Sequence, residues 1–239
     1  MAVVEDKLDT ALNGLYKDRV KDGLVHCNPD ETWMDTWFKE DVRSGARIEI
    51  QALTLAMLKL HGTLLRKPDE REDKLKSLVR KNFWNGKILK DGLGDATARP
   101  NIFLAAYVYP ELLTKKEWET CFDNTLPKLW LEWGGLSTIS KDHPLFTPED
   151  TGENVTSYHR GDSWFWVNNI AALVLHKTNS KKYSKYVKAI LAASEKEQLE
   201  LGVGGASAEL SSAKELRSEG CWIQAWSVAT LIELLHTLH

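Results

Sequence analysis

The chain has 239 residues, with 31 lysines and arginines against 34 aspartates and glutamates, so its formal net charge is -3. At 43% hydrophobic residues the composition is that of a globular protein, which excludes wholesale disorder. The balance of charge argues against a nucleic-acid partner, whose binding needs a basic footprint. We expect no membrane partner, because no apolar run approaches the roughly 18 residues of a spanning helix.

The N-terminus and the cysteines predict a cytoplasmic protein. The first ten residues turn acidic at once and lack the layout of a signal peptide. Cys27, Cys121 and Cys221 are far apart and form no CxxC pair. This cysteine usage suits a reducing cytosol and offers neither a zinc site nor a disulfide framework. We therefore expect no metal.

Hydrophobic periodicity predicts helices along the whole chain. The first has apolar residues at helical spacing from Val4 to Tyr16 and ends before Gly23. Thr114 and Ser180 are expected to cap the helices that follow them. The eight predicted helices cover, in chain order, residues 4–22, 45–61, 69–83, 100–109, 115–126, 162–177, 181–200 and 217–238.

These helices alternate between largely apolar and amphipathic with a charged face. Such alternation is typical of the inner and outer helices of an α/α toroid, and no sustained heptad favours a coiled coil. No linker or low-complexity tract divides the chain, so residues 1–239 are interpreted as a single domain. The long connections 22–44, 129–161 and 201–218 are rich in tryptophan, glycine and acids, and loops of this length are usually functional.

Two acidic residues in these loops are candidates for chemistry. Asp35 lies in a loop, 28–37, that places three acids among tryptophans, where partial desolvation is expected to raise the pKa of a carboxyl to suit a general acid. Glu209 follows a glycine-rich stretch and can supply the second carboxylate that glycoside hydrolysis needs. For each residue the alternative is an ordinary solvated charge in a polar loop.

Two further segments carry polar and aromatic side chains just before apolar helices. In the segment 157–166, His159 with tyrosine and tryptophan neighbours can bind sugar hydroxyls, while Asp162 or Ser163 is also expected to cap the next helix. Arg99 and Asn101 can hold hydroxyls or fix their loop. A metal role for His159 is disfavoured, because no second histidine lies at ligand spacing.

Several motifs in one order resemble the amylo-α-1,6-glucosidase domain of glycogen debranching enzymes. They are, in sequence, DGL at 22–24, ETWMD at 31–35, GARIEIQAL at 45–53, RPN at 99–101, GLST at 135–138, YHRGDSWFW at 158–166 and GCWIQAWS at 220–227. Each motif alone is weak evidence for the family, but the order and spacing of all of them together are specific. The resemblance runs from about residue 22 to the end of the chain.

The resemblance implies an all-α fold, an (α/α)6 barrel like that of glucoamylases, and inverting hydrolysis of the α-1,6-linked glucose left at trimmed branches of glycogen-type α-glucan. It implies Asp35 as general acid and Glu209 as general base, with carboxyls roughly 6.5–9.5 Å apart. No cofactor is implied. The substrate pocket implied by the resemblance comprises Glu31, Trp33, Arg99, Asn101, Tyr158, His159, Trp164, Trp166 and Gln224.

The sequence departs from the family pattern in two ways. Ala208 stands between Ser207 and Glu209, and Arg160, Asp162 and Phe165 replace the family's usual residues, which bears on substrate specificity. Eight helices are also too few for a twelve-helix barrel, and the resemblance begins near what would be the fifth. An open barrel exposes an apolar flank. We therefore expect a homo-oligomer or a complementing chain.

Two alternatives to the debranching activity stay open at this point. One is a degenerate barrel that binds carbohydrate without hydrolysing it, or a truncated one that needs a partner chain. The other is a related α-glucosidase that acts on trehalose, glucosyl-glycerate or another glucoside. Retention of both candidate carboxylates disfavours the first.

Overall fold

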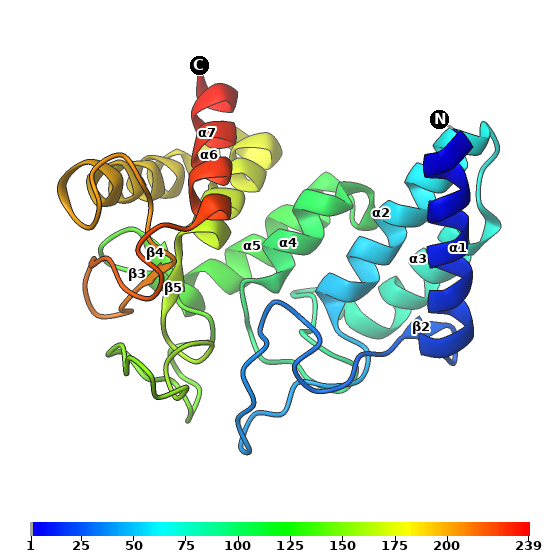
Figure 1. Ribbon diagram of the computed structural model, residues 1–239, viewed down its shortest axis with the longest axis horizontal. Helices are drawn as coiled ribbons and strands as arrows, with labels where there is room; N and C mark the ends of the chain where they lie inside the picture. The colour runs from blue at the N-terminus through cyan, green and yellow to red at the C-terminus, as the bar shows by residue number, and fades with distance from the viewer. Residues whose placement is uncertain (1) are drawn as a thin grey trace.

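The computed structural model describes residues 2–239, and it is built mainly from helices (Figure 1). The predicted all-α class is confirmed. Among the described helices, none is both long and apolar enough to cross a bilayer. The helices are α1 (Ala2–Arg19), α2 (Ile48–Leu65), α3 (Glu70–Phe83), α4 (Asn101–Val108), the 3-10 helix η1 (Pro110–Leu112), α5 (Lys115–Leu129), α6 (Phe165–Glu200) and α7 (Ala225–Leu238).

The helices pack in two layers that follow the chain. Helices α2, α4, α6 and α7 contact one another in succession, while α1 and α3 pack on α2, and α5 packs on α6. Figure 1 shows this succession as a curved row from α1 at one end to α7 at the other. Helix α4 buries most of its residues, whereas the charged α3 buries only Leu75, Val79 and Phe83. This is the alternation that the sequence predicts.

The main core lies between the two layers. Phe122 of α5 stacks on Phe103 of α4, with 5.1 Å between ring centroids, and on Trp118 at 5.6 Å. Burying side chains of this size stabilises the fold by about 1.5–3 kcal/mol each. A second, smaller cluster lies where the long loops gather and consists of Leu104, Trp164, Trp166, Val167, Ile170 and Leu210.

The segment labelled α6 consists of two helices, as the sequence predicts, which meet at a kink at Asn179. The Asn179 backbone is extended with φ -159°, and its side chain accepts a hydrogen bond from the Lys182 N–H. The predicted cap at Ser180 is therefore wrong by one residue, because the asparagine amide takes the role. Thr114 caps α5 as predicted, in a reciprocal capping box with Glu117.

Two other helix starts lie later in the chain than the sequence predicts. Asp162 and Ser163 do not cap α6, which begins at Phe165 without a side-chain cap. Helix α7 begins at Ala225 rather than near residue 217. The intervening segment is held instead by backbone hydrogen bonds, since Glu219 bonds to Leu210 in both directions and the Glu209 N–H donates to the Cys221 carbonyl at 2.8 Å.

Three pairs of two-residue strands, absent from the prediction, organise the long connections. They pair β1 (Val20–Lys21) with β2 (Leu24–Val25), β3 (Trp130–Leu131) with β4 (Gly135–Leu136), and β5 (Ser163–Trp164) with β6 (Leu210–Ser211), all antiparallel. In the last pair Trp164 lies opposite Leu210, and the Phe165 N–H donates to the Glu209 carbonyl at 3.3 Å. This pairing fixes Glu209 beside the start of α6.

Candidate active site

Asp35 lies in the loop that leads into α2 and meets a buried histidine. Its Oδ1 is 3.5 Å from Nε2 of His159, and its side chain is 63% exposed. Polar contact with His159 holds the pKa of Asp35 below its usual range, outweighing the partial burial that raises it. The expected rise in pKa is therefore wrong for the free protein, because the carboxyl is too exposed for desolvation to dominate.

His159 itself is almost fully buried, and its two ring nitrogens have no hydrogen-bond partner within the described residues. Burial lowers the pKa of His159 to about 4. The imidazole is consequently neutral near pH 7, where it places an uncharged polar ring against Asp35.

Glu209 is held by three donors. The Tyr158 hydroxyl donates to Oε1 at 2.8 Å, the side-chain amide of Gln224 donates to the same oxygen at 3.3 Å, and the Cys221 N–H donates to Oε2 at 3.0 Å. Burial and the Glu209 carboxylate raise the pKa of Tyr158, so its hydroxyl keeps its proton. These bonds orient a carboxylate, which can accept a proton from a water molecule.

The predicted aromatic residues form one cluster between the two carboxylates. Trp33 points its ring edge-on at His159, Trp164 and Trp166, with centroids 5.3, 5.4 and 5.1 Å away. His159 stacks on Trp164 at 5.2 Å, and Tyr158 packs edge-on against both. Trp33 is partly exposed, whereas Trp164 and Trp166 are buried.

The two candidate carboxylates therefore meet at adjacent residues of one loop. Asp35 contacts His159, and Glu209 accepts a hydrogen bond from Tyr158. The loops that carry them come from opposite ends of the chain. This arrangement has a candidate proton donor and a candidate proton acceptor on a shared aromatic surface, as a two-carboxylate hydrolysis requires.

Three predicted site residues are used differently. Asn101 accepts a hydrogen bond from Trp33 Nε1 at 2.6 Å and donates to Asp91 at 2.7 Å, so both ends of its amide are occupied. Arg99 is buried and donates to the His159 carbonyl and to Asp41. Both residues position the cluster. Glu31 binds Arg19 and Asn28 in an exposed pairing and does not join it.

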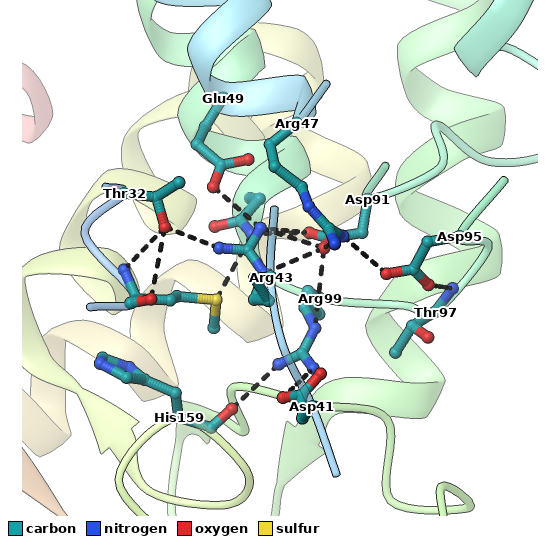
Figure 2. A network of polar contacts seen from close by, with 12 residues as sticks. Thr32, Asp41, Arg43, Arg47, Glu49, Asp91, Asp95, Thr97, Arg99 and His159 are labelled. Carbon is teal, nitrogen blue, oxygen red and sulfur yellow. Dashed lines mark hydrogen bonds and ion pairs between the residues drawn. The ribbon is translucent and has the colours of Figure 1, made fainter. Parts of the chain in front are cut away.

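A buried ion network that the sequence analysis missed supports the Asp35 loop (Figure 2). Arg43 donates to Asp91, to Glu49 at 2.9 Å and to the Thr32 hydroxyl at 2.8 Å. Arg47 also contacts Asp91, at 3.1 Å. The signal in the sequence was Arg47 and Glu49, two charges in the mostly apolar segment 45–53.

Comparison with known proteins gives one family and a set of similar structures. A sequence model of a family described as amylo-alpha-1,6-glucosidase matches residues 3–233. The fold is similar to that of a GH63 mannosylglycerate hydrolase from Thermus thermophilus in complex with glucose, at 14% identity and a TM-score of 0.57, covering 81% of this chain and 45% of that one. An uncharacterized conserved protein from the same organism matches with the same identity and TM-score and is covered to 47%.

The chain thus spans about half the length of the solved structures that it matches. No curated protein matches its sequence. Within residues 2–239, no cluster of three histidine, cysteine or acidic side chains has an arrangement that could hold a metal ion.

Proposed function

Because the chain belongs to the amylo-alpha-1,6-glucosidase family, we propose that it carries the hydrolytic centre of a glycoside hydrolase. Membership confirms the resemblance drawn from the sequence motifs. The proposed reaction is inverting hydrolysis of α-1,6-linked glucose at trimmed branches of glycogen-type α-glucan. The observation that carries the proposal is the meeting of Asp35 and Glu209 at the Tyr158–His159 dipeptide among tryptophans.

In this proposal Asp35 protonates the leaving oxygen and Glu209 activates the attacking water. Asp35 is ionised in the free protein near pH 7, because its pKa is low. A sugar bound over its exposed carboxyl removes water from it and raises its pKa, which is the condition for acid catalysis. Glu209, held by three donors, is already oriented to accept a proton from the water.

We further propose that residues 1–239 form one domain, the C-terminal part of an (α/α)6 barrel in the cytoplasm. The succession of α2, α4, α6 and α7 as one layer, with α3 and α5 outside, supports this geometry. In this proposal the remaining wall of the barrel comes from a complementing chain or from a second copy of this chain. Exposed apolar side chains on α2 and α7 support such a neighbour.

The test is glucose release from glycogen limit dextrin that phosphorylase has trimmed. We expect release by the wild-type chain and a loss of about 100-fold or more in Asp35→Asn and in Glu209→Gln. Asp30→Asn, an exposed acid in the same loop, is the matched control and should retain activity. Near-normal release by either site variant would reject the role of that residue.

A second candidate function is hydrolysis of a small glucoside. It is favoured by the likeness to the mannosylglycerate hydrolase, whose structure holds glucose. A panel of limit dextrin, trehalose, glucosyl-glycerate and mannosylglycerate separates the two candidates. Binding of maltooligosaccharide without release of sugar from any substrate would instead indicate a carbohydrate-binding protein.

A further inference from the structure

Glu197, in the last turn of α6, is a fully buried acid that does not belong to the aromatic cluster. Its Oε1 accepts hydrogen bonds from the Ala208 N–H at 3.0 Å and from the Ser218 hydroxyl at 2.8 Å. The Ser218 hydroxyl in turn accepts a hydrogen bond from the Gly202 N–H at 3.0 Å. One carboxyl oxygen therefore connects the end of α6 to two segments that are not adjacent in the sequence.

These two segments are the ones that hold Glu209. Ala208 directly precedes Glu209 in the chain. The segment that follows Ser218 supplies the Cys221 N–H and the Gln224 side-chain amide, which both donate to the Glu209 carboxylate. The two segments are also paired with each other, because the Glu209 N–H donates to the Cys221 carbonyl at 2.8 Å. Glu197 thus anchors both the backbone that carries the carboxylate and the segment that provides two of its three donors.

The stability of the fold alone gives no reason for an acid at position 197. Burial raises the pKa of Glu197 because it penalises the charged form, and Oε2 has no partner among the described residues. A negative charge near the C-terminus of a helix is also opposed by the helix dipole. An apolar side chain of similar size avoids the cost of burying a carboxyl. What such a side chain lacks is the acceptor for Ala208 and Ser218.

We infer that Glu197 is a positioning residue, which sets the orientation of the Glu209 carboxylate by fixing both segments that hold it. The inference rests on the proposed function, in which Glu209 activates the attacking water. Glu197 acts through the Ala208 backbone and the Ser218 hydroxyl, and not on the sugar. Because a displaced catalytic group loses rate steeply, the effect belongs to turnover rather than to substrate affinity.

The experiment compares two substitutions of Glu197 during hydrolysis of trimmed limit dextrin. Glu197→Met keeps a side chain of similar length and removes the acceptor, whereas Glu197→Gln keeps an amide oxygen for both donors. We expect kcat to fall about tenfold or more in Glu197→Met, with KM unchanged because the aromatic cluster is intact. Glu197→Gln should retain most of the wild-type kcat.

Tyr183→Phe is the control for a loss of stability in the same segment. The Tyr183 hydroxyl bonds to Asp123 and to the Glu119 carbonyl of α5, away from Glu209. This variant should unfold at lower urea concentration than the wild type and retain its kcat. Ser218→Ala removes one of the two contacts, and we expect it to lower kcat less than Glu197→Met does. It gives a second test if Glu197→Met does not fold.

Amide hydrogen exchange, followed by NMR, reads the same positioning without any substrate. We expect the Glu209 and Cys221 amides, which do not contact Glu197 directly, to exchange faster in Glu197→Met and at the wild-type rate in Glu197→Gln and Tyr183→Phe. Unchanged kcat in Glu197→Met and Ser218→Ala, a change in KM alone, or equal losses of kcat in Glu197→Met and Glu197→Gln would overturn the inference.

Failure of the inference and failure of the proposed function give different results. Faster exchange at Glu209 and Cys221 in Glu197→Met, in a chain that hydrolyses no substrate, would support the positioning of Glu209 and reject the proposed activity. Unchanged exchange at both amides in Glu197→Met would overturn the positioning, whatever the chain hydrolyses.

Discussion

Gly220 packs closely against the carboxylate of Glu209. It has a φ of +69°, and a methyl group added to it would lie 2.4 Å from Oε2 of Glu209. That contact is far below van der Waals distance, so the carboxylate must move. We expect Gly220→Ala to lower turnover at least about tenfold, because small displacements of a catalytic group are costly.

The control is Gly205→Ala, which has the same kind of backbone strain but no contact with Glu209. Gly205 also has a positive φ, of +85°, and open space around its Cβ position. Gly205→Ala should therefore lose a similar amount of stability while retaining turnover. Equal activity in the two variants, measured as initial rates on the same substrate, would contradict the contact with Glu209.

A second residue-scale feature is a buried acid with an altered pKa. Asp162 is fully buried and accepts a hydrogen bond from the Ser157 hydroxyl at 2.8 Å, and its other oxygen has no partner among the described residues. The pKa of Asp162 is raised to about 8, mainly by burial and also by the nearby Asp150 and Glu219, against a lowering by the Ser157 hydroxyl.

The raised pKa gives a pH dependence of stability with a definite sign. Between about pH 4 and pH 8 the folded state holds a proton that the unfolded state has lost, so this contribution to stability falls as the pH rises through that range. We expect urea unfolding to show a smaller fall from pH 5 to pH 8.5 in Asp162→Asn than in the wild type. An identical fall in unfolding free energy in both proteins would show that Asp162 does not cause this pH dependence.

At the scale of elements, the buried ion network connects the Asp35 loop to α2 and α4. Asp91 receives hydrogen bonds from Arg43, Arg47 and Asn101. Removing one partner of a buried ion pair leaves the others uncompensated and typically costs about 3–5 kcal/mol. We expect a loss of that order in the unfolding free energy of Asp91→Asn, measured by urea denaturation.

A surface pair provides the comparison for this variant. Glu111 and Lys59 form an ion pair in which both side chains are about half exposed. Such pairs contribute about 0–1 kcal/mol, so Glu111→Gln should change stability little. Similar losses in the two variants would mean that the network around Asp91 is not a special source of stability.

The helices could be predicted from sequence because their signal is local. Periodicity and caps such as Thr114 are contained in single windows of the chain. The strand pairs could not be predicted, since two residues carry no periodicity. The ion-pair partner of Arg43 and Arg47 could not be predicted either. Asp91 is far away in sequence, and a charged residue in an apolar segment does not indicate which acid it will pair with.

The candidate site was predictable to a similar extent. The family motifs brought Trp33, Tyr158, His159 and Glu209 together in expectation, and the structure has them in contact. Motifs do not tell which polar side chains face a ligand and which face the protein. For that reason Asn101, expected in the pocket, proved to bridge Trp33 and Asp91.

At the scale of the whole molecule, the curved row of helices leaves apolar side chains uncovered. Leu53 and Leu60 of α2 are 47% and 50% exposed, and Ile232 of α7 is 61% exposed. Exposed apolar surface of this kind marks contact sites. We expect light scattering to show self-association of the chain at micromolar concentration, and Leu60→Lys with Ile232→Lys to reduce it.

Leu199→Lys is the matched control, because Leu199 is 70% exposed near the end of α6. It should leave the apparent mass unchanged. A wild-type chain that is monomeric at all concentrations, with no change in the double variant, would reject the self-association.

The Tyr158–His159 dipeptide has a consequence for motion. Its Cα atoms are about 3.8 Å apart across one rigid peptide unit, and each of its side chains contacts one of the two carboxylates. The loops that carry Asp35 and Glu209 thus share one short piece of backbone as a contact. We expect the separation of the two carboxylates to change less, when the helices on either side shift, than it would without this shared contact.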